Sequence, residues 1–203
     1  MALGLPHLGF GVGLRAEHIS EILSSEPEVD WFEILSENVM DSQGRALALA
    51  EAVAERYPVV LHGVSMNIGS SDPLDWAYLD RLMALAERLK PAWISDHLCF
   101  TGLGGHNSHD LLPMVYSEAS LEHVVGRIQA VQRHLDRPLV LENPSSYIRF
   151  KGSTIDEWSF MTRMAKESGC GLLVDVNNVA VSAFNHGWDP ELYLESLPAE
   201  QIV

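Results

Sequence analysis

The sequence predicts an α/β protein, a TIM (β/α)8 barrel of which residues 1–203 form about six βα units in a single, incomplete domain. Short apolar runs alternate six times with amphipathic helical patterns, which indicates a parallel sheet with right-handed crossovers. Runs such as residues 59–61 and 171–174 are continuously apolar, as is typical of strands covered on both faces. No GxGxxG motif follows the first run, so a dinucleotide-binding fold has little support.

Each predicted strand is a short apolar run bounded by turn-forming residues. The six strands are expected at residues 8–14, 29–35, 58–63, 92–100, 138–143 and 171–178. The final PAEQIV repeats the helix-to-strand transition found before residue 58, which predicts the beginning of another strand. Because a complete barrel usually needs about 250 residues, we expect a gap where strands seven and eight belong. Exposed strand edges also predict poor solubility of this chain alone.

Each strand is followed by a segment with apolar side chains at helical spacing. These helices are expected around residues 19–23, at 46–57, from Asp72, from Ser117, at 154–169 and from Asp189. Asp72 and Asp189 each precede a proline, which suits the first position of a helix. Thr154 and Glu157 form a capping-box pattern, and Gly169 suits the C-terminal end of that helix.

The composition excludes several classes of partner. The formal net charge is −15 and no basic stripe is available for phosphates, so we expect no nucleic acid partner. No run approaches the ~20 apolar residues of a membrane span, and no signal-peptide pattern opens the sequence. Cys99 and Cys170 are the only cysteines, too few for a disulfide framework. We therefore expect a cytoplasmic protein without membrane contact.

Metal-competent side chains end four consecutive apolar runs: His62, His97, Glu142 and Asp175. The C-terminal ends of parallel strands share one face of a barrel, so these side chains are expected to converge there. A mixed set of nitrogen and oxygen ligands without thiolate suits catalytic Fe, Mn or Zn rather than a structural zinc site. The number of ligands makes two or more ions plausible.

Side chains along a strand point alternately to its two faces, so residues two positions apart share a face. This rule makes the predicted site more specific. If Val60, Val140 and Leu173 fill the barrel interior, the polar residues two positions later lie in its mouth. Asp175 then shares its face with Asn177, and together they form a pair of oxygen ligands.

Each of these residues also has a structural interpretation. A strand-end histidine can be a hydrogen-bonded core residue, while Glu142 and Asp175 can cap turns or helices. Taken together they favour a site, because four buried charges without partners would be costly. Seven further residues are candidates for supporting or substrate contacts: Glu33, Glu37, Asp96, Asn143, His186, His106 and His109.

The Gly-rich segment at residues 101–113 follows the fourth strand, at the same end of the predicted barrel. Loops in this position commonly bind substrate or gate a site. We predict that this segment lies over the site mouth and is more mobile than the strands.

Six motifs occur in the order LHGVSMNIG, SDHLCFTG, DLLPMVY, LENPSSY, VDVNNV and NHGWDP. As a set they resemble the multinuclear non-haem iron-dependent oxidative enzymes, whose best-known member makes the copper-binding peptide methanobactin. The resemblance covers nearly the whole chain. It implies a TIM barrel of the xylose-isomerase-like type that uses two or three Fe ions and O2. It also implies a small partner protein, and a ribosomally made precursor peptide whose cysteine residues are modified.

The resemblance also implies a role for individual residues. His62, His97 and Glu142 match the ligands of one iron, with Glu142 bridging to a second. Asp175 matches a ligand of the second iron, and Asn177 matches a ligand of a third. The family's remaining ligands lie on the seventh and eighth strands, so the resemblance implies a partial metal site in these 203 residues.

Two other functions compete with oxidation of a peptide. One is a divalent-metal-dependent isomerase or phosphodiesterase of the xylose-isomerase-like type, which would use two ions as Lewis acids. No lysine lies at a predicted strand end to assist such chemistry, since Lys90, Lys151 and Lys166 fall in helices or their flanks. The other is a non-catalytic metal-binding or partner-docking protein.

Overall fold

A computed structural model describes residues 3–42 and 44–203. Its main sheet has six strands, all parallel and neighbouring one another in chain order. They are β1 (Gly11–Gly13), β2 (Trp31–Leu35), β3 (Val59–His62), β4 (Ile94–His97), β7 (Leu139–Glu142) and β8 (Gly171–Leu173). The prediction of an α/β fold around a parallel sheet is therefore confirmed.

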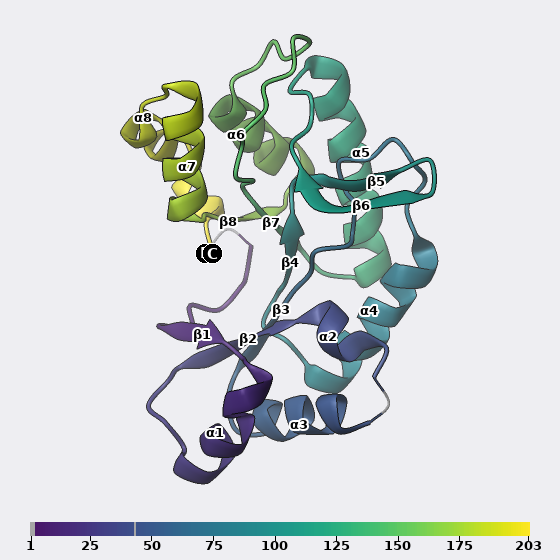
Figure 1. The fold of residues 1–203 in the computed structure, drawn as a ribbon, viewed down its shortest axis with the longest axis vertical. Coiled ribbons are helices and arrows are strands. Elements are labelled where there is room, and N and C mark those ends of the chain that lie inside the picture. The colour runs from purple at the N-terminus through teal and green to yellow at the C-terminus, as the bar shows by residue number, and fades with distance from the viewer. Residues whose placement is uncertain (1–2, 43) are drawn as a thin grey trace.

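The helices follow the strands along the chain and run along the outer side of the curved sheet (Figure 1). They are α1 (Ile19–Ser25), α2 (Ser36–Met40), α3 (Arg45–Ala54), α4 (Trp76–Leu89), α5 (Glu118–Leu135), α6 (Glu157–Ser168), α7 (Val176–His186) and α8 (Pro190–Glu195). Two short 3-10 segments, η1 (Ala16–His18) and η2 (Ala199–Gln201), complete the helical elements of the described ranges. No helix in those ranges is long and apolar enough to cross a membrane.

Two apolar clusters lie on opposite faces of the sheet. The larger packs strand residues such as Phe32, Leu61 and Leu141 against the surrounding helices. The smaller joins Val60, Trp93 and Val140, with Leu173 among the partly buried residues packed against them. The predicted barrel-interior position of Val60 and Val140 is therefore confirmed, and it sets the direction of the polar residues two positions later.

Helix caps were predicted with mixed success. Ser117 and Asp189 cap α5 and α8 as expected, and Gly169 ends α6 with φ +74°. The predicted beginning of a helix at Asp72 is wrong, because Asp75 caps α4 by accepting from the Tyr78 amide. The carbonyl of Asp72 instead accepts a hydrogen bond from buried Arg127 at 2.6 Å, which fixes residue 72 in the preceding loop.

The capping box predicted at residues 154–157 is also wrong. The amides of Thr154 and Ile155 both donate to the carbonyl of Tyr116, at 2.8 and 3.1 Å. This contact fixes the two residues outside the helix, so α6 begins only at Glu157. Hydrogen bonds to the distant Tyr116 carbonyl have here replaced the predicted side-chain cap.

The fourth predicted strand, at residues 92–100, is too long, and the Gly-rich segment after it forms a hairpin instead of the predicted loop. β4 ends at His97, and the chain then forms an antiparallel hairpin of β5 (Phe100–Leu103) and β6 (His106–Leu112). Gly104 and Gly105 form its turn with φ +61° and +76°, a region that glycine enters without a Cβ clash.

The sixth predicted strand, at residues 171–178, is too long. β8 ends at Leu173 and α7 begins at Val176, because Asp175 caps that helix through a 2.8 Å hydrogen bond from the Asn178 amide. The capping interpretation of Asp175 is therefore confirmed. Asn177 consequently lies in the first turn of a helix instead of on a strand.

The two edges of the sheet are β1 and β8, which do not pair with each other in the part of the chain described. A cavity of about 520 Å³ lies at this opening, lined by Leu3, residues 5–9, the tryptophans Trp31 and Trp93, and Val203 among others. Ile202 forms a parallel bridge with Leu172, and the Val203 amide donates to the Leu172 carbonyl at 3.0 Å. The expected strand-like pairing at PAEQIV thus begins beside β8.

Candidate metal centre

Three predicted ligands meet at the C-terminal ends of adjacent strands: His62 on β3, His97 on β4 and Glu142 on β7. One ligand atom from each lies within 4.8 Å of the other two. The Oε2 atom of Glu142 is 3.3 Å from the Nε2 atoms of both histidines. All three side chains are about nine-tenths buried. We call these three residues the triad.

Hydrogen bonds on the far side of each imidazole fix its tautomer. The Nδ1 atom of His97 is 3.1 Å from the carbonyl oxygen of Gly63, which can only accept, so Nδ1 carries the proton. The Nδ1 atom of His62 is 2.9 Å from the Ser95 hydroxyl, which itself donates to the Leu61 carbonyl at 3.2 Å. Ser95 therefore accepts from His62. Both Nε2 atoms then present lone pairs toward Oε2 of Glu142.

Burial suppresses every charge in the triad. It lowers the pKa of His97 to about 4, helped by the neighbouring His62, and it also lowers the pKa of His62. Burial raises the pKa of Glu142 to about 7, with further contributions from the charges of Asp175 and Glu33. Metal binding requires deprotonated ligands, and neutral imidazoles already meet that condition.

The spacing of the ligand atoms fits a metal ion. Two ligands at ~2.1 Å from one ion are ~3.0–3.4 Å apart when the angle between them is octahedral or tetrahedral. The two observed nitrogen–oxygen separations of 3.3 Å lie within that range. Two histidines and one carboxylate also form the donor set of non-haem Fe(II) sites with open positions. The residues present thus fit a catalytic metal.

Two of the predicted supporting residues, Glu37 and Asp96, accept hydrogen bonds from backbone amides in the turn after β3. Glu37 Oε1 accepts from the Val64 amide at 3.0 Å, and Asp96 Oδ2 accepts from the Met66 amide at 3.1 Å. Asp96 is fully buried and faces away from the triad, as strand alternation predicted, and burial raises its pKa to about 8. A Cβ on Gly63 would lie 2.5 Å from Asp96 Oδ2, so glycine is required where the turn orients His97.

Asn143 and Asp175 join the ends of β7 and β8. The side chain of fully buried Asn143 bonds both backbone groups of Asp175, accepting from its amide at 2.7 Å and donating to its carbonyl at 3.1 Å. Asp175 lies close enough to Glu142 to raise its pKa. Among the described residues the metal-competent cluster holds only the triad, so ligation by Asp175 and by exposed Asn177 stays a prediction.

Glu33 lies on β2, where burial raises its pKa and the charges of Arg15 and His97 lower it. The effect of Glu33 on the pKa of Glu142 also places it beside the triad. His186 lies apart from this cluster, since it stacks on Trp188 and its Nε2 atom is 3.2 Å from the Ser146 hydroxyl.

His106 and His109 are exposed on β6. The hairpin nevertheless stands at the triad end of the sheet, because His109 and Asp110 line a cleft of about 250 Å³ with Val64 and Ser65. These last two residues belong to the turn that follows β3. The predicted mobility of the segment stays a prediction.

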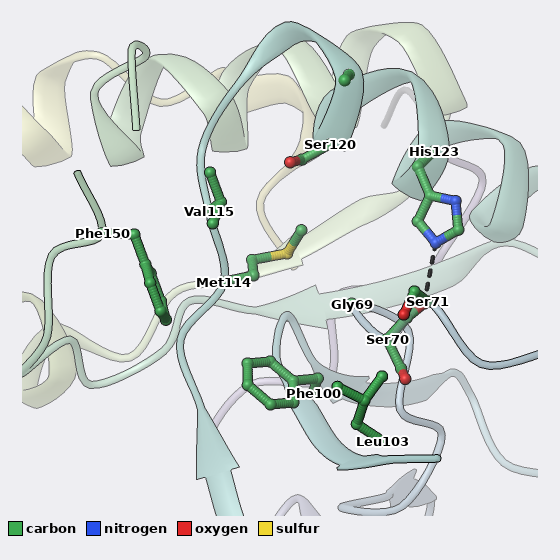
Figure 2. A pocket seen from close by; sticks show the side chains of 11 residues that line it. Gly69, Ser70, Ser71, Phe100, Leu103, Met114, Val115, Ser120, His123 and Phe150 are labelled. Atoms are coloured by element: carbon green, nitrogen blue, oxygen red, sulfur yellow. Dashed lines mark hydrogen bonds between the residues drawn. The ribbon is translucent and has the colours of Figure 1, made fainter. Parts of the chain in front are cut away.

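Sequence reasoning missed Asn178, whose side-chain amide donates to Oε1 of Glu142 at 3.0 Å. The repeated asparagine of VDVNN was a signal, but only the fold brings residue 178 to residue 142. Sequence reasoning also missed an apolar pocket of about 450 Å³ between the hairpin and α5. Figure 2 shows Phe100, Met114 and Phe150 around it, and none of its lining residues belongs to the triad.

Residues 9–203 match the family model described as "RiPP precursor modification enzyme MbnB/TglH/ChrH". The chain belongs to this family. A UPF0276 protein of Anaeromyxobacter sp. (strain Fw109-5) is 55% identical over 195 residues, which cover 96% of this chain and 69% of the relative. A UPF0276 protein of Caulobacter vibrioides is 50% identical over 199 residues, which cover 98% of this chain and 71% of the relative. The resemblance inferred from the six motifs is confirmed.

Solved structures with low sequence identity share the fold. The 3-keto-D-glucoside 4-epimerase of E. coli superposes with a TM-score of 0.60 at 14% identity, covering 97% of this chain and 77% of the epimerase. A fusion protein of a xylose isomerase-like TIM barrel with a 4-hydroxyphenylpyruvate dioxygenase gives 0.63 at 12% identity, covering 97% of this chain and 30% of the fusion. Such identities show the fold alone, and they confirm the predicted TIM-barrel class.

Proposed function

We propose that this protein is an iron- and O2-dependent oxidoreductase that modifies cysteine residues of a ribosomally made precursor peptide. The observation that supports this proposal most strongly is the triad. Two imidazole lone pairs and one carboxylate oxygen converge at 3.3 Å separations, and hydrogen bonds on the opposite side of each ring fix this arrangement. A set of two histidines and one carboxylate suits Fe(II) with open coordination positions.

His62, His97 and Glu142 would hold the first iron, and bound iron would supply redox chemistry that protein side chains lack. Ser95 and the Gly63 carbonyl keep each imidazole oriented for binding. The apolar cluster around Val60 and Val140 lies on the same face of the sheet as the site and would present an apolar surface beneath the bound metal. We propose Asp175 and Asn177 as ligands of a second and a third ion.

The substrate and partner are also proposals. The family's description supports a precursor peptide as the substrate, and we propose that a small partner protein assists its binding. Both cysteines of the chain are free and buried, which suits the reducing cytoplasm that we propose as its compartment.

The test uses full-length protein purified without oxygen and loaded with Fe(II). Its substrate is a synthetic copy of any small cysteine-containing peptide found encoded beside its gene. We expect O2 consumption and a change in peptide mass only when protein, iron and peptide are all present. The Glu142→Gln variant should be inactive, and the exposed control Ser24→Ala should match the wild type.

An unchanged peptide mass with iron-loaded protein would overturn the proposal. Turnover of a sugar with Zn or Mn in the absence of O2 would favour the isomerase instead. Tight metal uptake without turnover of either substrate would favour a binding protein.

A further inference from the structure

We propose that Asn178 is a positioning residue that sets the carboxylate of Glu142 for metal binding, an inference that rests on the proposed metal function of the triad. Asn178 is the third residue of α7, and it reaches Glu142 across 36 positions of sequence. Neither the family description nor the motif comparison assigns it a role.

The side-chain amide of Asn178 has only one favourable orientation. Its Nδ2 atom is 3.0 Å from Oε1 of Glu142 and 3.0 Å from the backbone carbonyl of Asn143. Both neighbours are acceptors, so both Nδ2 hydrogens are used. Rotating the amide by half a turn would place its oxygen against two acceptors, which is unfavourable. The orientation of the donor is therefore fixed.

The same residue stands between two carboxylates. Its side chain donates to Glu142, while its backbone amide donates to Oδ1 of Asp175 at 2.8 Å. Glu142 and Asp175 are two carboxyl groups close to the ends of neighbouring strands, and two donors from one residue stabilise that arrangement. The backbone of Asp175 is in turn held by the side chain of Asn143. The N-terminus of α7 is thus tied to the triad through Asn178.

This contact leaves the other oxygen of Glu142 for the histidines. Because Asn178 engages Oε1, the opposite atom, Oε2, is the one that lies 3.3 Å from both Nε2 atoms. Without Asn178 the carboxylate could rotate about its terminal torsion, which has a broad, roughly two-fold preference. A metal would then have to restrain Glu142 itself, at a cost in affinity.

The experiment is a double-mutant cycle on full-length protein with Zn(II) as the probe, competed against a chromophoric chelator. We expect Asn178→Ala to weaken Zn(II) binding 10–100-fold, the range for residues that orient ligands without touching the metal. In a Glu142→Ala background, where His62 and His97 remain as Zn(II) ligands, the same substitution should change binding less than twofold, because the carboxylate that Asn178 orients is gone. Asn178→Ser removes the same two donors and serves as the second variant if alanine impairs folding.

Asn185→Ala is the matched control, since Asn185 lies on the same helix and donates one hydrogen bond to the Ser146 carbonyl at 3.1 Å. It should leave Zn(II) affinity unchanged. Co(II) spectra should show altered ligand-field bands in the Asn178 variants and unaltered bands in the control.

Two results would overturn the inference while leaving the triad intact as a metal site. One is wild-type affinity in both Asn178 variants. The other is an equal loss of affinity in the wild-type and Glu142→Ala backgrounds, which would show that Asn178 acts through the fold. Failure of the wild-type protein to bind Zn(II), Co(II) or Fe(II) would instead overturn the proposed function and this inference together.

Discussion

Replacing Glu142 with glutamine should stabilise the metal-free protein while weakening its metal site. Glu142 is about nine-tenths buried, and its pKa is raised from 4.5 to about 7. A raised carboxyl pKa means that the folded state binds the proton more tightly than the unfolded state. The stability contribution is therefore complete below pH 4.5 and is lost as the pH rises toward 7. Above pH 7 the loss amounts to about 3 kcal/mol.

Glutamine keeps an oxygen to accept from Asn178 and adds an amide that can donate to an imidazole lone pair. In the presence of a chelator at pH 8, we expect urea unfolding to give a Glu142→Gln variant about 3 kcal/mol more stable than the wild type. At pH 4 the two proteins should be nearly equal. Comparing the two proteins removes the contributions of other buried carboxyls, such as Asp96. A variant that is less stable than the wild type at pH 8 would refute this account of Glu142.

Three further predictions concern the surroundings of the triad. Ser95→Ala removes the hydroxyl that accepts from His62, and it should weaken Zn(II) binding about tenfold in a chelator competition. An unchanged Zn(II) affinity would show that the Ser95 hydroxyl does not orient the imidazole. Gly63→Ala places a Cβ 2.5 Å from Asp96 Oδ2 and should lower the free energy of unfolding by about 1–3 kcal/mol. The control Gly126→Ala has open space around its added Cβ and should raise the free energy of unfolding by about 1 kcal/mol. Equal effects of the two substitutions would contradict a steric clash at residue 63. At pH 6 the triad carboxyl is protonated and both imidazoles are neutral, because their pKa values are lowered. Calorimetry in buffers of different ionisation enthalpy should therefore detect release of about one proton per metal ion. Release of three protons would refute the neutral state of the two imidazoles.

The part of the site that sequence reasoning predicted depends on periodicity. Side chains along a strand point alternately to its two faces, so with Val60 and Val140 inside the barrel the polar residues two positions later had to point into its mouth. His62 and Glu142 do so, at the ends of β3 and β7. This inference needed only local pattern and the parallel arrangement of strands.

The part that sequence reasoning missed depends on competition between side chains and backbone. The run GLLVDV stays apolar on both sides of Asp175, so its pattern does not mark the end of β8. The carboxylate of Asp175 accepts from the Asn178 amide and begins a helix there instead. The bond from Asn178 to Glu142 joins distant positions, so only the fold reveals it.

The hairpin of β5 and β6 could have been predicted from the sequence. Gly104 and Gly105 form a two-residue turn, and such pairs are a strong hairpin signal. The polar residues of β6 hid the strand, because His106, Asn107, Ser108 and His109 offer no apolar alternation. An exposed strand with no buried face has little apolar alternation in its sequence.

Anomalous diffraction at the iron edge, on crystals of full-length protein purified without oxygen, tests the central claim most directly. We predict a peak bonded to Nε2 of His62, Nε2 of His97 and Oε2 of Glu142, with metal–ligand distances of about 2.0–2.2 Å. The peak should disappear in a His62→Ala, His97→Ala double variant that remains folded. Iron bound elsewhere, with the three side chains still in mutual contact and no ion between them, would contradict the claim.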